Sequence, residues 1–117
     1  MCFEAQYLQD LIDSARQIAV LIDGFDFEMF RDDRRTRSAV LHELTVIGES
    51  ANRLTSEMKH RYPEIPWDEI IGTRNVIVHG YFDLLWDRIW NTSTVDVPVL
   101  ERRATVMLKE QFPELNP

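Results

Sequence analysis

Apolar residues recur at helical spacing over two long stretches of this chain, and this pattern constrains the fold more than any other feature. In residues 7–22 they recur every three or four positions, and Gly24 follows where such a helix would end. Residues 34–60 repeat the pattern around Gly48. Because glycine inside a helix costs about 1 kcal/mol relative to alanine, we expect Gly48 to permit the close approach of another helix. The two stretches predict an all-α fold with two long antiparallel helices at its centre.

Turn and cap signals separate these stretches from the rest of the chain. Asp26 is expected to cap a single turn over residues 25–30, and Asp32 or Asp33 to cap the second long helix. Two prolines fix a loop over residues 61–66. A further helix is therefore expected to begin directly after this loop.

Three shorter helices are predicted after the loop. The first begins near Trp67 and is expected to bury residues 76–78. Residues 84–91 predict the second, whose two tryptophans suit core or dimer packing. After a polar break, Asp96 is expected to cap the last helix, which reaches about Phe112. The predicted architecture is an antiparallel bundle of about four to five helices.

Length and composition describe one domain, residues 1–117, large enough to bury a single core. The formal net charge of −7 argues against general affinity for nucleic acid but leaves room for a small basic cleft. No apolar run has the length of a transmembrane helix and no secretory signal is recognisable, so no membrane association is expected. Since Cys2 is the only cysteine, an internal disulfide is excluded, and a cytoplasmic location is expected.

Residues 31–37 alternate between basic and acidic side chains. The favoured interpretation is a solvated helix entrance whose arginines pair with nearby acids. A phosphate-binding patch is the alternative.

The most informative stretch holds Arg74, Asn75, His79 and Tyr81 in the pattern R-N-x-x-x-H-x-Y. On a helix, Asn75 and His79 share a face because they are four residues apart. Arg74 and Tyr81 would nearly eclipse each other, although Gly80 marks the expected helix end. An imidazole exchanges protons near neutral pH and a guanidinium grips two anionic oxygens, so the group suits cleavage at a phosphate.

Each of these residues also has an ordinary interpretation. A single Arg or His on an amphipathic helix is usually solvated or caps the helix, and a tyrosine often stacks on a helix end. Glu49 and Arg53 lie off the apolar stripe of the second long helix. There Glu49 would orient Arg74, although a plain surface glutamate is the simpler interpretation. His79 has no second ligand at metal-binding spacing, so neither a metal nor another cofactor is expected.

The motif resembles the signature R-x-x-x-x-H-x-Y of the HepT-like branch of the HEPN superfamily of small helical domains, with Arg74, His79 and Tyr81 in place. The stretch Ile47–Ala51 is similar to the I-G-E-A segment of these proteins, and Asp96–Leu100 matches their D-x-P-x-L element. A tryptophan-bearing helix follows the motif, as in that family.

This resemblance implies a metal-independent RNA endonuclease that acts as the toxin of a toxin–antitoxin pair. It implies a homodimer and a minimal nucleotidyltransferase antitoxin that attaches AMP to Tyr81. On chemical grounds, His79 would move a proton, Arg74 would clamp the phosphate, and Asn75 would hydrogen-bond either of them.

A second function, of a different class, remains open. The chain would be a non-catalytic helical module that binds a nucleotide, or presents one to the nucleotidyltransferase, with Arg74 and His79 as ligands only. The acidic net charge favours this alternative, whereas the complete motif favours the nuclease.

Overall fold

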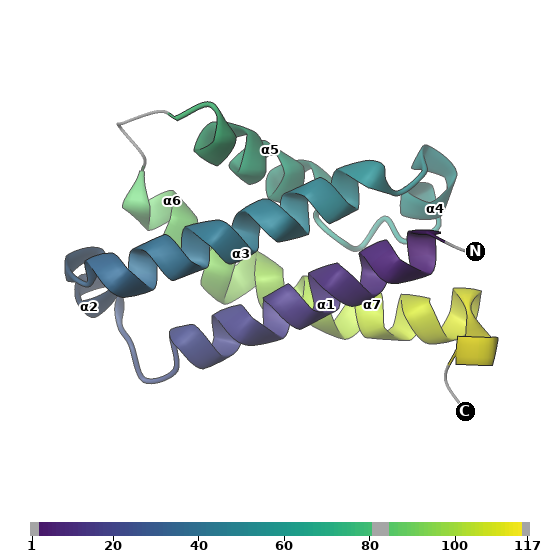
Figure 1. The fold of residues 1–117 in the computed structure, drawn as a ribbon, viewed down its shortest axis with the longest axis horizontal. Helices are drawn as coiled ribbons and strands as arrows, with labels where there is room; N and C mark the ends of the chain where they lie inside the picture. Colours follow the sequence, from purple (N-terminus) through teal and green to yellow (C-terminus); the bar gives the residue numbers. More distant parts are fainter. Residues whose placement is uncertain (1–2, 81–84, 116–117) are drawn as a thin grey trace.

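The computed structural model describes residues 3–80 and 85–115. Its four longest helices form an antiparallel bundle (Figure 1). Within these ranges there is no β-strand. The elements are α1 (Phe3–Leu21), α2 (Phe27–Asp32), α3 (Arg34–Arg53), α4 (Ser56–His60), α5 (Trp67–Val78), α6 (Trp86–Asn91), the π-helical segment η1 (Thr92–Asp96), α7 (Val97–Gln111) and the 3-10 turn η2 (Pro113–Leu115).

The predicted pair of long antiparallel helices is confirmed. Helices α1 and α3 run in opposite directions side by side at the centre of the bundle (Figure 1). Helix α7 packs on the other side of α1, and α5 packs on α3. The all-α bundle expected from the sequence is therefore the observed fold.

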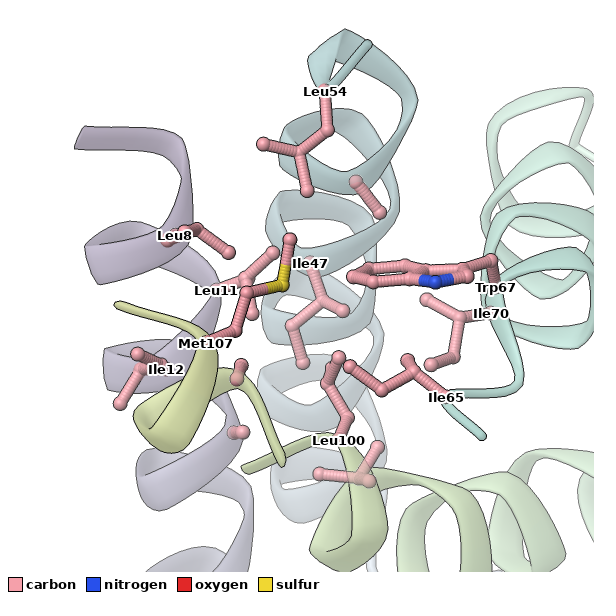
Figure 2. Packing of buried hydrophobic residues seen from close by; sticks show 14 of the residues in the cluster. Leu8, Leu11, Ile12, Ile47, Leu54, Ile65, Trp67, Ile70, Leu100 and Met107 are labelled. Atoms are coloured by element: carbon pink, nitrogen blue, oxygen red, sulfur yellow. The ribbon is translucent and has the colours of Figure 1, made fainter. Parts of the chain in front are cut away.

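The core is built from side chains of the four longest helices, α1, α3, α5 and α7. Figure 2 shows Ile47 of α3 among leucines of α1, with Trp67 of α5 approaching from the opposite side. Each fully buried aliphatic side chain contributes about 1.5–3 kcal/mol from leaving water. The largest fully buried side chains are Leu8, Leu11, Ile12, Ile18, Phe30, Val40, Ile47, Ile65, Ile89, Val97, Leu100 and Met107.

Two of the three predicted aspartate caps, at Asp26 and Asp33, are confirmed. A carboxylate oxygen of Asp26 accepts from the Met29 N–H at 2.8 Å, and one of Asp33 accepts from the Thr36 N–H at 3.2 Å. Each satisfies a backbone N–H that has no partner within its own helix. The predicted tryptophan packing is also confirmed, because Trp86 and Trp90 pack on the core next to Phe30.

The expectation that the arginines of residues 31–37 pair with nearby acids is wrong for all but one of them. Arg31 pairs with Asp32 at 3.2 Å. Arg37 instead donates to the Arg31 carbonyl at 2.8 Å and lies over the Trp86 ring. For the other arginines in this segment, the structure describes no ion pair with any residue of the ranges 3–80 and 85–115.

The second long helix is shorter than predicted. Instead of continuing to residue 60, α3 ends at Arg53, and Leu54 adopts an extended backbone with ψ 146°. Thr55 then caps α4, because its hydroxyl accepts from the Met58 N–H at 3.1 Å. The turn buries Leu54 at 3% exposure while the apolar spacing continues across it, so the sequence pattern conceals the break.

The polar break predicted at residues 91–94 is wrong, and so is the capping role of Asp96. The chain stays helical from Trp86 to Gln111 through η1. Pro98 has no N–H to donate to the preceding turn, and the wider π-helical turn accommodates this gap. The polar side chains do not end the helix because they bond to its own carbonyls, as Ser93 does with the Ile89 carbonyl at 2.8 Å.

Candidate active site

Helix α5 carries the motif at the edge of the bundle, with one face against α3 and η1 and the other in solvent (Figure 1). Its buried side chains come from its first seven residues: Trp67, Ile70 and Thr73. The prediction that residues 76–78 are buried is wrong for Val78, which is 47% exposed, whereas Val76 is half-buried and Ile77 packs against the core. Only the first part of α5 is enclosed by neighbouring helices, so its C-terminal half presents both polar and apolar side chains outward.

Arg74 lies where α5 crosses α3 at Gly48. A Cβ atom added to Gly48 would lie 2.1 Å from the Cβ of Arg74 and 2.5 Å from its Cγ. No side chain larger than hydrogen fits there without moving the helices apart. The expectation that Gly48 permits a close helix approach is therefore confirmed, and the neighbour it admits is the motif arginine.

The guanidinium of Arg74 extends from this crossing toward the outer surface. One terminal nitrogen donates to the side-chain oxygen of Asn75 at 2.9 Å, and the other lies 3.5 Å from a carboxylate oxygen of Glu49. Its Nε is buried and has no hydrogen-bond partner among the described residues. The Arg74 side chain is 25% exposed, so it retains donors that an anionic ligand could use.

His79 forms the C-terminal cap of α5. Its backbone N–H donates to the Asn75 carbonyl at 3.1 Å, and the N–H of Gly80 donates to the Ile77 carbonyl at 3.1 Å. Gly80 has φ +67°, a conformation that glycine adopts without strain. The helix thus ends at Val78, and the prediction that Gly80 marks its end is confirmed. The expected eclipse of Arg74 and Tyr81 stays a prediction. Tyr81 itself, like Asp83 and Cys2, lies outside the described residues.

The structure brings Arg74, Asn75 and Glu49 into contact, and places His79 on the exposed face that it shares with Asn75. Five residues of helix rotate His79 about 140° away from Arg74, so the two do not project from the same side of α5. Asn75 stands between them, since it bonds to the guanidinium and lies one turn before the imidazole.

Arg53, the other supporting residue predicted, lies apart from this group. Its guanidinium carbon is 5.8 Å from the centroid of the Tyr7 ring on α1. Together with Glu49, it lines a small hollow of about 200 Å³ between α1 and α3. The structure therefore places Arg53 one turn beyond Glu49, toward α1 rather than toward the motif.

A second guanidinium, which the sequence did not indicate, packs against α5 from a neighbouring helix. Arg88 of α6 places its Nε 3.3 Å from a carboxylate oxygen of Glu69, and its terminal nitrogen would lie 3.5 Å from a Cβ added at Gly72. Gly72 precedes His79 by two turns on nearly the same side of the helix. No local sequence pattern links residues 69 and 88, because their contact depends on how α6 packs beside α5.

In the parts of the chain that the structure describes, no group of three or more His, Cys, Asp or Glu side chains could hold a metal ion. None of the helices in these parts combines the length and the apolar character that a membrane crossing requires.

Comparison with known proteins gives a consistent picture. A family model described as ribonuclease HepT-like matches residues 11–107. A Thermococcus cleftensis protein named "Probable ribonuclease HepT" is 33% identical over 95 residues, covering 81% of this chain and 86% of its own. The candidate RNase MJ1380 of Methanocaldococcus jannaschii is 27% identical over 101 residues, covering 86% and 93%. The candidate RNase TTE0752 of Caldanaerobacter subterraneus is 29% identical over 105 residues, covering 90% and 94%. No solved structure matches at a significant level.

Proposed function

The chain belongs to the HepT-like ribonuclease family, and from that premise we propose that it is a metal-independent RNA endonuclease acting as the toxin of a toxin–antitoxin pair. The observation that carries this proposal is the guanidinium of Arg74, held by Asn75 on a helix whose exposed face also bears His79. Asn75 links the two groups, because it bonds to the guanidinium and lies one turn before His79. A phosphodiester bound across Asn75 would meet a guanidinium that holds its oxygens and an imidazole that can move a proton.

The proposed reaction uses the 2′-hydroxyl of the RNA as the nucleophile. His79 accepts the hydroxyl proton while the 2′-oxygen forms a bond to phosphorus. The bond from phosphorus to the 5′-oxygen breaks, leaving a 2′,3′-cyclic phosphate and a 5′-hydroxyl. Arg74 stabilises the charge on the non-bridging oxygens, and Asn75 keeps the guanidinium in place.

The leaving 5′-oxygen needs a proton from a second group. One chain offers a single motif histidine, so we propose a symmetric homodimer in which a second copy supplies its own imidazole as the acid. The location of α5 at the bundle edge supports this arrangement, because its outer face is open to another chain. The exposed Val78 would add apolar area to such an interface.

Control of the enzyme is proposed to act through Tyr81. A nucleotidyltransferase antitoxin would transfer AMP from ATP to the phenolic oxygen, with loss of the phenol proton and release of pyrophosphate. An anionic adduct two residues from His79 would compete with RNA for the phosphate site. Intact mass measured after incubation with the partner and ATP tests this: one or more AMP additions are expected, and none on Tyr81→Phe.

Cleavage of labelled RNA with an excess of EDTA tests the catalytic proposal. The wild type is expected to cut RNA, whereas His79→Ala should lose about 10²–10⁴-fold in rate, the usual contribution of a positioned acid or base. His42→Ala, an exposed histidine of α3, is the matched control and should cut normally. If wild type and His79→Ala cut equally, or neither cuts, the chain is instead the non-catalytic nucleotide-binding module that the acidic net charge favours.

A further inference from the structure

The start of α3 carries three arginines that the site described above does not use: Arg34, Arg35 and Arg37. We call them the entry patch. We propose that the entry patch binds the phosphate backbone of the RNA that the motif cleaves, a few nucleotides away from the scissile bond. This inference rests on the proposed function and extends it to how the substrate is held.

The first argument is alignment on α3. Arg34, Arg37, Leu41 and Gly48 are spaced by three, four and seven residues, so they lie along one side of the helix. That side meets Arg74 at Gly48. Arg34 and Arg37 thus continue the surface on which the motif arginine sits, and Arg35 adds a charge beside them at the same end of α3.

The second argument is the end of α5. Helices α3 and α5 run in opposite directions, and α5 points toward the end of the bundle where α2 and the start of α3 lie (Figure 1). Val78, the last residue of α5, is about 6 Å along the axis from Arg74, whereas Arg37 is about 16 Å along α3 from Gly48. The patch therefore begins about 10 Å beyond Val78, the residue before His79, and this distance is about three stacked nucleotides at 3.4 Å each.

The third argument is that these guanidiniums are available. Arg34 and Arg35 are exposed, and neither makes a hydrogen bond or ion pair with a described residue. The neighbouring carboxylates have other partners, since Asp33 caps α3 and Asp32 pairs with Arg31. Unpaired guanidiniums are thus free to bind an anion here; Arg102 and Arg103 on α7 share this property but not the alignment with the motif, which makes them the control pair.

The fourth argument is that Arg37 is held in place before any ligand arrives. Its guanidinium carbon lies 4.8 Å from the Trp86 ring centroid, and one nitrogen donates to the Arg31 carbonyl at 2.8 Å. Its Nε is buried without a hydrogen-bond partner among the described residues. Arg74 also has a buried Nε, so at both ends of the proposed track a guanidinium is held against the protein surface.

The experiment compares two double variants that remove the same charge. Arg34→Gln with Arg35→Gln removes the exposed part of the patch, and Arg102→Gln with Arg103→Gln removes two adjacent exposed arginines from α7. The probes are fluorescent RNAs of about 3 and about 12 nucleotides, within the range of single-strand sites, with 2′-O-methyl riboses that prevent cleavage. Binding is measured over a range of salt concentrations, with melting temperatures as a check on folding.

For the longer RNA, the patch variant is expected to bind several-fold to about tenfold more weakly than wild type. Its salt dependence should flatten by about 1.4 in the log–log slope, at about 0.7 for each lost phosphate contact. The trimer should bind both proteins equally, and the α7 variant should match the wild type with either RNA.

Several results would overturn the entry patch. The two double variants could lose RNA affinity equally, or neither could lose any. The patch variant could lose as much affinity for the trimer as for the longer RNA, or the wild type could fail to bind the longer RNA. Failure of the proposed function has a different signature, because it shows in the cleavage assay as no dependence on His79. If His79-dependent cleavage is found while the patch variant binds RNA like the wild type, the nuclease stands and the patch is wrong.

Discussion

Gly48 and Arg74 meet at the crossing of α3 and α5 with no room for a side chain between them. The absent Cβ of Gly48 would lie 2.1 Å from the Cβ of Arg74, well inside any real carbon–carbon contact. The distance between these two helices is therefore set at the motif itself. It follows that packing of the bundle and the location of the guanidinium are coupled through one glycine.

We expect Gly48→Ala to destabilise the protein, although alanine favours helix by about 1 kcal/mol. The new methyl overlaps the backbone-proximal part of Arg74, and overpacking of this kind costs about 1–3 kcal/mol. Denaturant unfolding measures the net loss, and RNA cleavage should fall with it because Arg74 moves.

Gly72→Ala is the matched control for that change, because it lies inside α5 but has room. Its nearest neighbour is the terminal nitrogen of Arg88 at 3.5 Å, an ordinary contact with a flexible side chain. This variant should gain up to about 1 kcal/mol in unfolding free energy. Equal gains in unfolding free energy for Gly48→Ala and Gly72→Ala would show that α3 and α5 do not cross as closely as described.

Arg74→Lys is expected to fold normally and to lose about 10²-fold in kcat/KM for RNA. Lysine keeps the charge and most of the stem packed at Gly48, but it lacks the planar fork that contacts Asn75 at 2.9 Å and would grip two phosphate oxygens. Cleavage kinetics and the melting temperature are the measurements, with Arg102→Lys on α7 as the control. Unchanged kinetics would mean that only a positive charge is needed at this position.

Glu49→Gln should lower KM for RNA by up to several-fold and leave kcat nearly unchanged. The carboxylate lies 3.5 Å from the Arg74 guanidinium and is 47% exposed, so the pair is worth less than about 1 kcal/mol. Its removal frees the guanidinium for phosphate, while Asn75 still orients it. Glu114→Gln, exposed near the C-terminus, controls for net charge. A fall in kcat instead would make Glu49 a positioning residue for Arg74.

Asp96→Asn should stabilise the protein at neutral pH but not in acid. Partial burial, and then the negative charge of Glu69, raise the pKa of Asp96 above 3.8 in the folded state. The folded protein therefore binds this proton more tightly than the unfolded chain, so the penalty of ionising Asp96 grows as pH rises from about 4 through the folded pKa.

Unfolding free energies at pH 7 and about pH 3 test this sign. The Asn variant should exceed wild type in unfolding free energy at pH 7 and equal it at the lower pH. A loss of stability at pH 7 would mean that the Asp96 carboxylate is stabilised by an interaction stronger than its burial.

Features that depend on a few neighbouring residues were predictable from the sequence. The long helices follow from apolar spacing, and the caps at Asp26 and Asp33 from a side chain that reaches three residues ahead. The close approach at Gly48 was also predictable, because a glycine inside a helix needs a reason. The local pattern gave the kind of contact but not the partner helix.

The predicted helix boundaries were wrong where a polar side chain could either cap a helix end or bond to a carbonyl of the helix and continue it. Leu54 ends one helix and Thr55 starts another within continuous apolar spacing. Ser93 and its neighbours prolong a helix where polar residues usually mark a break. Both choices depend on whether the segment packs on its neighbours, since capping and back-bonding to the helix differ little in free energy.

The sequence by itself determined the helical class, the caps at Asp26 and Asp33 and the motif residues, because each depends on chemistry within one or two turns of chain. Only the tertiary structure decided which groups meet: Arg74 with Glu49 from another helix, Arg88 over α5, and His79 on the open face of α5. The physical reason is that helix periodicity sets the direction of each side chain around its own axis. The partner in that direction is set by how whole helices pack, which involves residues far apart in the chain.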